Sequence, residues 1–76
     1  MKVVLYTRDD CGLCEAAEEM LKRARTMIRF DLELVYIDNE DGLRERYGDL
    51  VPVVTVDGEE VAATPLDEAS LLAALS

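Results

Sequence analysis

Histidine and tryptophan are absent from the chain, and positive charge is scarce, with 8 Lys and Arg against 17 Asp and Glu and a net charge of −9. Phosphate binding depends on clustered Lys and Arg, so this balance disfavours nucleic acid as a partner. No apolar run reaches membrane-spanning length, and Met1 and Lys2 lead directly into an apolar strand pattern rather than into a signal peptide. We therefore expect a cytoplasmic protein that binds neither nucleic acid nor a membrane.

The size and composition favour one small globular domain over residues 1–76. Half of the residues are apolar and a third are charged, which is a balance typical of a folded domain and not of a disordered chain. A chain of this length has to gain its stability from a single compact core.

The chain holds only two cysteines, Cys11 and Cys14, with Gly12 and Leu13 between them. An apolar run over residues 3–6 precedes them and a helical pattern begins at Leu13, so Cys11 lies where a strand is followed by a helix. The amide groups and dipole at a helix N-terminus stabilise a thiolate, which is the nucleophilic form of cysteine. A second cysteine one turn later can close a disulfide on the first, so the spacing indicates a dithiol redox centre.

Two other readings of this cysteine pair stay open. Zinc would need four ligands, and without histidine or further cysteines these could come only from two chains, each giving one pair. A purely structural disulfide is the other reading, although so short a loop removes little entropy from the unfolded chain. We expect no metal site within one chain.

Periodicity predicts the order β-α-β-α-β-β-α. We expect strands over residues 2–7, 31–38, 51–56 and 60–63, and helices over residues 12–28, 39–47 and from the segment 64–67 to about residue 75. The first strand should be central, the strand–helix–strand unit should make its two strands parallel, and Asp57-Gly58 should form a hairpin turn. The first helix should bury Met20 and Met27, and Gly48 should follow the second helix as its C′ residue. The predicted fold class is α/β, with a four-stranded mixed sheet flanked by three helices.

Two short segments of the sequence, Tyr6-Thr7-Arg8 followed by the Cys11/Cys14 pair, and Val51-Pro52, resemble those of a known family. The first is similar to the glutaredoxin opening, and the second is similar to the Val-Pro beside the active site of thioredoxin-fold proteins. The sequence thus resembles the short glutaredoxin-like proteins of bacteria, which are members of the thioredoxin-fold superfamily. The resemblance covers essentially the whole chain. It implies a thioredoxin-like fold of glutaredoxin size, with a cis peptide at Val51-Pro52 that packs against the cysteines.

The predicted function is that of a thiol-disulfide oxidoreductase acting on protein disulfides or mixed disulfides. Cys11 would be the nucleophile and Cys14 the resolving cysteine. Arg8 could add positive charge or bind a substrate carboxylate, and the Val51 backbone could pair with an extended substrate next to Pro52. The remaining residues expected to contact substrate are Gly12, Leu13 and Asp67.

Departures from the glutaredoxin pattern lead us to expect weak glutathione binding. Leu50 replaces a threonine, and Ala62 and Ala63 replace two glycines that allow glutathione to approach closely. We expect a monomer without a required cofactor, which takes electrons from a reductase or, weakly, from glutathione. The alternatives are a non-catalytic binding or redox-sensing module that uses the Val51-Pro52 strand edge, and a dimeric metal-binding protein.

Overall fold

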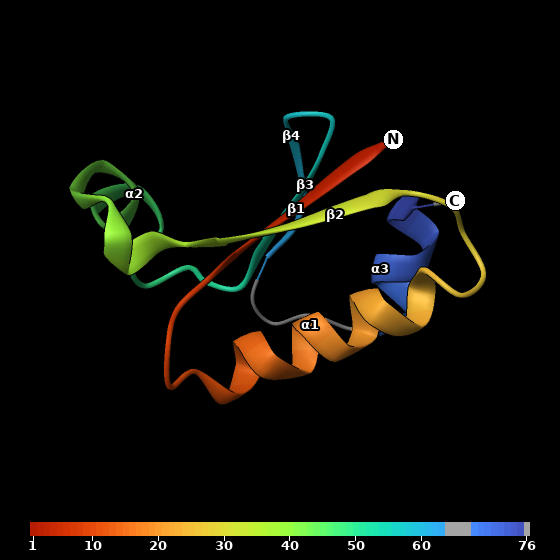
Figure 1. Cartoon of the computed structure of the whole chain (residues 1–76), viewed down its shortest axis with the longest axis horizontal. Coiled ribbons are helices and arrows are strands. Elements are labelled where there is room, and N and C mark those ends of the chain that lie inside the picture. The colour runs from red at the N-terminus through yellow and green to blue at the C-terminus, as the bar shows by residue number, and fades with distance from the viewer. Residues whose placement is uncertain (64–67, 76) are drawn as a thin grey trace.

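A mixed four-stranded sheet in the order β2-β1-β3-β4 forms the centre of the molecule. The computed structural model describes residues 1–63 and 68–75. In chain order the elements are β1 (Lys2–Thr7), α1 (Gly12–Ala24), β2 (Asp31–Tyr36), the 3-10 turn η1 (Ile37–Asn39), α2 (Asp41–Tyr47), β3 (Val53–Val56), β4 (Glu59–Ala63) and α3 (Glu68–Leu75) (Figure 1). This order and the mixed sheet agree with the predicted α/β class.

The first strand lies in the middle of the sheet, as its apolar run predicts. It pairs with β2 in parallel and with β3 in antiparallel orientation, with Leu5 opposite both Leu34 and Val54. Its side chains alternate between fully buried and half-buried positions because the two faces of the sheet are covered unequally. The central position fixes where β1 ends, and the cysteine loop begins there.

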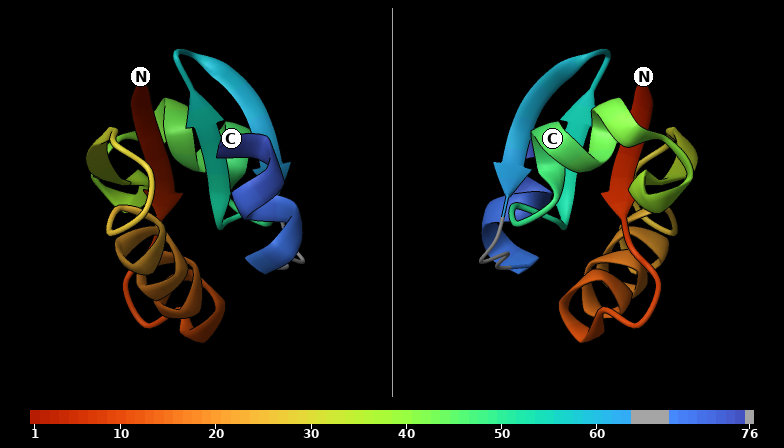
Figure 2. Two further views of the ribbon diagram at one scale, coloured as in Figure 1. Left: turned by 90° about the vertical axis from the view of Figure 1, so that its right-hand side faces the viewer. Right: turned by 90° about the vertical axis from the view of Figure 1, so that its left-hand side faces the viewer.

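Two helices cover one face of this sheet. In Figures 1 and 2, α1 and α3 lie on the same side of the strands. The main core forms between them and the sheet, and its buried residues are Val3, Leu5, Ala17, Leu21, Ala24, Phe30, Val54, Leu71 and Leu75. Arg23 of α1 also pairs with Glu68 of α3 at 3.1 Å, and this hydrogen-bonded carboxylate raises the pKa of Arg23. The core and this ion pair together hold α1 against the sheet and α3.

The second helix packs on the opposite face, close to the end of β1. Side chains alternate along a strand, so Tyr6 and Val53 point away from the main core. They meet a second apolar cluster with buried Ile37 and Tyr47, and the rings of Tyr6 and Tyr47 stack with centroids 4.5 Å apart. This cluster positions the segment between α2 and β3, which includes Val51.

The first helix ends at Ala24, four residues earlier than the predicted 28, and the burial predicted for Met27 is wrong. The Thr26 hydroxyl and backbone amide both donate to the Arg23 carbonyl, at 2.7 and 3.1 Å, which tightens the chain into a turn. Ile28 then returns to the core, whereas Met27 points outward and is 69% exposed. Met20 packs against the core as expected.

Other element boundaries also differ from the predicted ones. The second strand stops at residue 36 and continues as η1, α2 begins at residue 41, and residues 51 and 52 precede β3 rather than belong to it. Gly48 follows α2, but its φ of −45° lies in the right-handed region and not in the left-handed region typical of a C′ glycine. What favours glycine there is space, because a Cβ would lie 2.5 Å from the Arg44 carbonyl oxygen.

The hairpin between β3 and β4 turns at Asp57-Gly58, as predicted. Both residues have positive φ, 51° and 89°, which is typical of a two-residue turn that follows the twist of the strands. Asp57 also fastens the start of β1, since its carboxylate accepts the Lys2 amide at 2.9 Å and its own amide donates to the Lys2 carbonyl at 2.8 Å. The predicted start of the last helix, at residues 64–67, lies outside the described residues. Among those described, no helix combines the length and apolar character needed to cross a membrane.

Candidate active site

The cysteine pair lies at the N-terminus of α1, and the two residues are joined as a disulfide with their Cα atoms 5.2 Å apart. Cys11 is the N-cap residue and has an extended backbone, while Cys14 lies inside the first turn. The Cys14 side chain is only 1% exposed, whereas Cys11 is half-buried at the surface. Cys11 is therefore the sulfur that another molecule can reach.

The helix start supplies a hydrogen-bond donor to the outer sulfur. The Cys14 amide donates to Cys11 Sγ at 3.2 Å, and the Glu15 amide donates to the Cys11 carbonyl at 3.0 Å as the first bond of the helix. In the reduced protein the same amide and the helix dipole favour a thiolate at Cys11 over one at Cys14. The preceding residue, Asp10, has a φ of 53° and turns the chain sharply from the β1 loop into the helix.

We expect alkylation of the reduced protein at neutral pH to label Cys11 before Cys14. Cys11 combines solvent access with the stabilised thiolate, and Cys14 is covered by the helix turn and the core. Mass mapping of the protein after brief iodoacetamide treatment measures the order. Earlier labelling of Cys14 would reverse the roles assigned to the two sulfurs.

Val51 and Pro52 lie beside the cysteine loop. Their peptide bond is cis, and Pro52 is among the fully buried side chains. Val51 lines a surface hollow of about 390 Å³ together with Cys11. Its amide donates to the Tyr47 carbonyl at 3.1 Å, so pairing of this amide with an added substrate strand requires that bond to open.

Arg8 follows β1, and its guanidinium group is bonded to residues of neighbouring elements. Nε and Nη2 lie 3.4 and 3.2 Å from the two carboxylate oxygens of Asp38, and Nη1 donates to the Gly48 carbonyl at 3.3 Å. Arg8 thereby ties the cysteine loop to η1 and to the end of α2. Its predicted contact with a substrate carboxylate stays a prediction, and such a contact would compete with Asp38.

The other predicted contact residues lie differently. Gly12 and Leu13 are at the surface between the cysteines, and Leu13 is 61% exposed. Leu50, which precedes Val51, is 52% exposed, so Leu13 and Leu50 both present apolar side chains to solvent. Asp67 lies outside the described residues.

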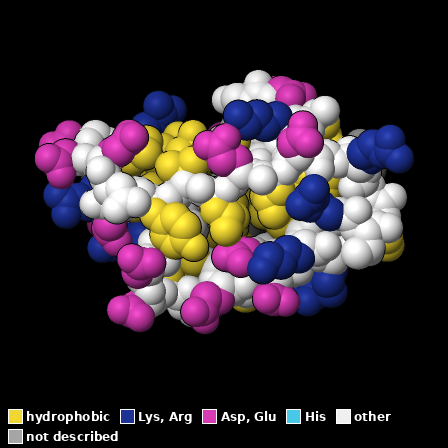
Figure 3. All heavy atoms as spheres, viewed as in Figure 1, with side chains coloured by type: hydrophobic (Ala, Val, Ile, Leu, Met, Phe, Trp, Pro, Cys, Tyr) yellow, Lys and Arg dark blue, Asp and Glu magenta, His cyan; other side chains and the backbone are white. Residues whose placement is uncertain are grey.

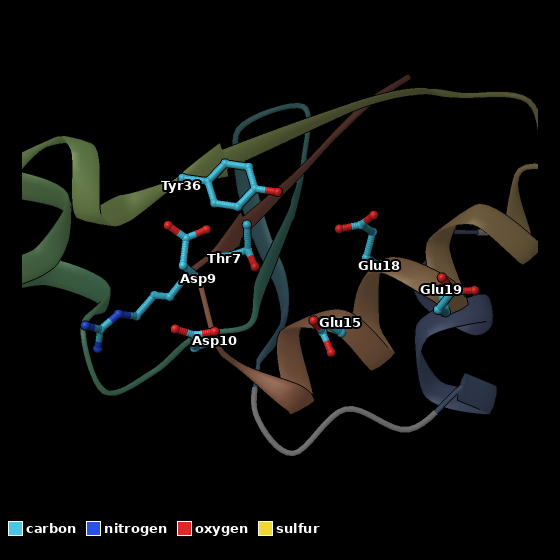
Figure 4. Close-up of a pocket in the computed structure, with 8 residues that line it drawn as sticks. Thr7, Asp9, Asp10, Glu15, Glu18, Glu19 and Tyr36 are labelled. Carbon is cyan, nitrogen blue, oxygen red and sulfur yellow. The ribbon is translucent and has the colours of Figure 1, made fainter.

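Carboxylates line the hollows at this end of the molecule. The hollow beside Cys11 is also lined by Asp9, Asp10 and Asp49. A second hollow of about 440 Å³, which shares Arg8, Asp9 and Asp10 with the first, is also lined by Thr7, Glu15, Glu18, Glu19 and Tyr36. Figure 4 shows that the carboxylates of this second hollow come from both the loop and α1, with the Tyr36 ring across from them. Over the whole face, Figure 3 shows acidic side chains gathered where α1 begins and basic ones toward its other end.

Sequence reasoning did not identify Asp38, Asp49 or Tyr36 as neighbours of the site. They lie far from Cys11 in the chain and belong to no local motif. The predicted topology could have indicated Tyr36 and Asp38, because it brings the end of β2 next to the end of β1, but it gave no signal for Asp49, which follows α2. No group of three or more His, Cys, Asp or Glu side chains in the described part of the chain is arranged to hold a metal ion.

Comparisons with known proteins agree with this arrangement. An uncharacterised protein of Mycobacterium tuberculosis is 34% identical over 77 residues, which cover 95% of this chain and 79% of the relative. The solution structure of protein Ne2328 from Nitrosomonas europaea matches with a TM-score of 0.81 and 35% identity, covering 99% of this chain and 91% of that one.

More distant structures establish the fold. Thioredoxin 1 from Thermosipho africanus matches with a TM-score of 0.72 at 15% identity and covers 97% of this chain and 89% of the thioredoxin. The mixed sheet with its helices is thus a thioredoxin-like α/β fold. The family model of the glutaredoxin-like domain (DUF836) matches residues 2–76. The chain therefore belongs to the glutaredoxin-like domain family.

Proposed function

We propose that this protein is a thiol-disulfide oxidoreductase that reduces protein disulfides or mixed disulfides through Cys11 and Cys14. The observation that carries the proposal is the unequal cysteine pair, in which an accessible sulfur at a helix N-terminus is bonded to a buried one a turn inside. A pair so arranged can be attacked at one sulfur only, which gives the exchange a defined order. Membership of the glutaredoxin-like family supports the same redox role.

In the proposed cycle, the Cys11 thiolate attacks a substrate disulfide and releases one substrate thiolate. Cys14, held within reach of Cys11 by the helix turn, then attacks Cys11 Sγ and releases the second substrate thiolate. The substrate gains two electrons and the dithiol becomes the disulfide. A cytoplasmic dithiol reductase, or less effectively glutathione, would return the protein to its reduced form.

Catalysed reduction of a protein disulfide tests this function directly. Insulin is mixed with dithiothreitol, and the release of its chains is followed with and without the protein. We expect the protein to accelerate release well above the dithiothreitol background. Binding of insulin without acceleration would instead favour the non-catalytic module that uses the Val51-Pro52 edge.

We expect glutathione to reduce the Cys11–Cys14 disulfide less well than a dithiol does at matched thiol concentration. Glutathione carries two carboxylates, and Arg8, the one Lys or Arg among the described residues that line the two hollows, is already paired with Asp38 and hydrogen-bonded to the Gly48 carbonyl. Losing one or two charge-assisted contacts, each contributing about 1.5–3 kcal/mol, weakens binding by roughly tenfold to about 10⁴-fold.

Stopped-flow reduction of the oxidised protein by each reductant gives the comparison. Arg8→Ala is the informative variant. If glutathione binds through Arg8, this substitution lowers the rate at which glutathione reduces the oxidised protein. Faster reduction by glutathione than by the dithiol, with the advantage lost in Arg8→Ala, would refute the expectation.

A further inference from the structure

Three carboxylates share a hollow with the accessible sulfur and have no ionic partner among the described residues. Asp9, Asp10 and Asp49 line the space of about 390 Å³ into which Cys11 opens, and all three residues are exposed. Their side chains form no ion pair with any of the described residues. They stand in contrast to Asp38, whose carboxylate is held by Arg8.

No Lys or Arg in the described part of the chain forms an ion pair with these three carboxylates. Among the described residues, Arg8 is the only Lys or Arg that lines either hollow, and it is paired with Asp38. The nearest base along α1, Lys22, is paired with Glu18 at 2.9 Å. Glu15 and Glu19, which line the adjoining hollow, add further negative charge beside the loop. A molecule that approaches Cys11 thus meets predominantly negative charge.

We propose that Asp9, Asp10 and Asp49 set the substrate preference of the dithiol centre, in favour of polypeptide disulfides flanked by Lys or Arg. This rests on the proposed oxidoreductase function and specifies its substrate class. A cationic flank gains attraction as the disulfide approaches Cys11, whereas an acidic flank meets like charges. Exposed Leu13, 61% accessible, offers apolar contact to a polypeptide beside the exchanging sulfurs.

The electron and proton balance is that of ordinary exchange. The Cys11 thiolate forms a bond to one peptide sulfur, the peptide S–S bond breaks, and the leaving thiolate takes a proton from water. Cys14 gives its proton to water, bonds to Cys11 Sγ and displaces the second peptide thiolate, which is protonated in turn. Two electrons pass from the protein to the peptide, and added dithiothreitol restores the dithiol. The three carboxylates take no part in these bond-making steps and affect only how readily the charged peptide approaches Cys11.

The test uses three peptide disulfides, dimers of Lys-Cys-Lys, Gln-Cys-Gln and Glu-Cys-Glu, each mixed with the reduced protein. Acid quenching and mass spectrometry give the rate at which the protein is oxidised. The flanking charges also alter the reactivity of the peptides themselves, so the measured quantity is the Lys-to-Glu rate ratio compared between protein variants, in which that contribution cancels. We expect Asp9→Asn/Asp10→Asn/Asp49→Asn to lower this ratio roughly tenfold at low ionic strength, and added NaCl to lower the wild-type ratio likewise.

A control variant removes the same number of negative charges at the other end of the sheet. Asp31 lies opposite Lys2, Glu59 opposite Val56 and Glu60 opposite Thr55, and none of the three lines either hollow at the dithiol. If the position of the carboxylates matters, Asp31→Asn/Glu59→Gln/Glu60→Gln should keep the wild-type Lys-to-Glu rate ratio. If only the net charge of the protein matters, it should lower this ratio as much as the site variant does. Asparagine tolerates the positive φ of residue 10, so the site variant is expected to fold, and circular dichroism checks this.

The outcomes separate the two proposals. If the neutral Gln-flanked disulfide oxidises the reduced protein no faster than it oxidises dithiothreitol, the oxidoreductase function fails, and the charge preference fails with it. If that peptide reacts rapidly but the site variant keeps the wild-type ratio, or the control variant loses as much, the charge preference alone is overturned. A ratio lowered only by the site variant supports it.

Discussion

Replacing Cys11 with serine is expected to lower disulfide reduction to the background of the added reductant. A serine hydroxyl is not ionised near neutral pH and cannot form the mixed disulfide, and Cys14 is too deeply buried, at 1% exposure, to replace it as the attacking group. The insulin reduction assay measures the loss. Because the substituted side chain lies at the surface end of the helix, the fold should remain and circular dichroism should be unchanged.

Cys14→Ser is the matched variant and should fail at a different step. Its Cys11 can still attack, but no second sulfur resolves the product, so a covalent complex with the substrate accumulates. Non-reducing gel electrophoresis detects this complex. If Cys11→Ser were to trap the substrate and Cys14→Ser were not, the assigned roles would be reversed, and if both variants kept full turnover the dithiol mechanism would be wrong.

Leu21→Ala is expected to remove a large part of the folding free energy. Leu21 of α1 is fully buried in the main core, and deletion of a buried leucine side chain costs about 2–5 kcal/mol. Small domains have a total stability of only about 5–15 kcal/mol. Urea unfolding of the oxidised protein measures the change, with circular dichroism as the signal because the chain has no tryptophan.

Leu13→Ala makes the same chemical change on the same helix at a position that is 61% exposed. It should alter the free energy of unfolding by no more than about 0.5 kcal/mol, as is usual for surface substitutions. Similar losses in Leu13→Ala and Leu21→Ala would mean that the packing of α1 against the sheet does not have the described form.

The sequence was most informative where a short segment determines its own structure. Val3 to Tyr6 is an apolar run between Lys2 and Thr7, and β1 spans Lys2–Thr7 as predicted. Asp57-Gly58 adopts the positive φ values that such a turn requires. Cys11 and Cys14 are joined at the helix start because their spacing alone brings them one turn apart.

The rest depends on contacts between distant segments, which no local pattern contains. Arg8 is hydrogen-bonded to Asp38 and Gly48, which lie 30 and 40 positions later. Only the folded structure shows these partners of the guanidinium group. Met27 continues the apolar spacing of α1, yet the turn made by Thr26 sends it outward. The Val51 amide is held by Tyr47, whose place depends in turn on its stacking with Tyr6.

The fastening of Lys2 to Asp57 has a practical consequence for attaching the protein to other molecules. Both main-chain groups of Lys2 are bonded to the hairpin, and β1 then runs the length of the sheet before it reaches the cysteine loop. A tag, fluorophore or solid support joined ahead of Met1 would therefore emerge at the end of the sheet opposite Cys11 (Figure 1). Immobilisation through that end leaves the exchanging sulfur facing the solution, where disulfide-bearing molecules can be captured and eluted with reductant.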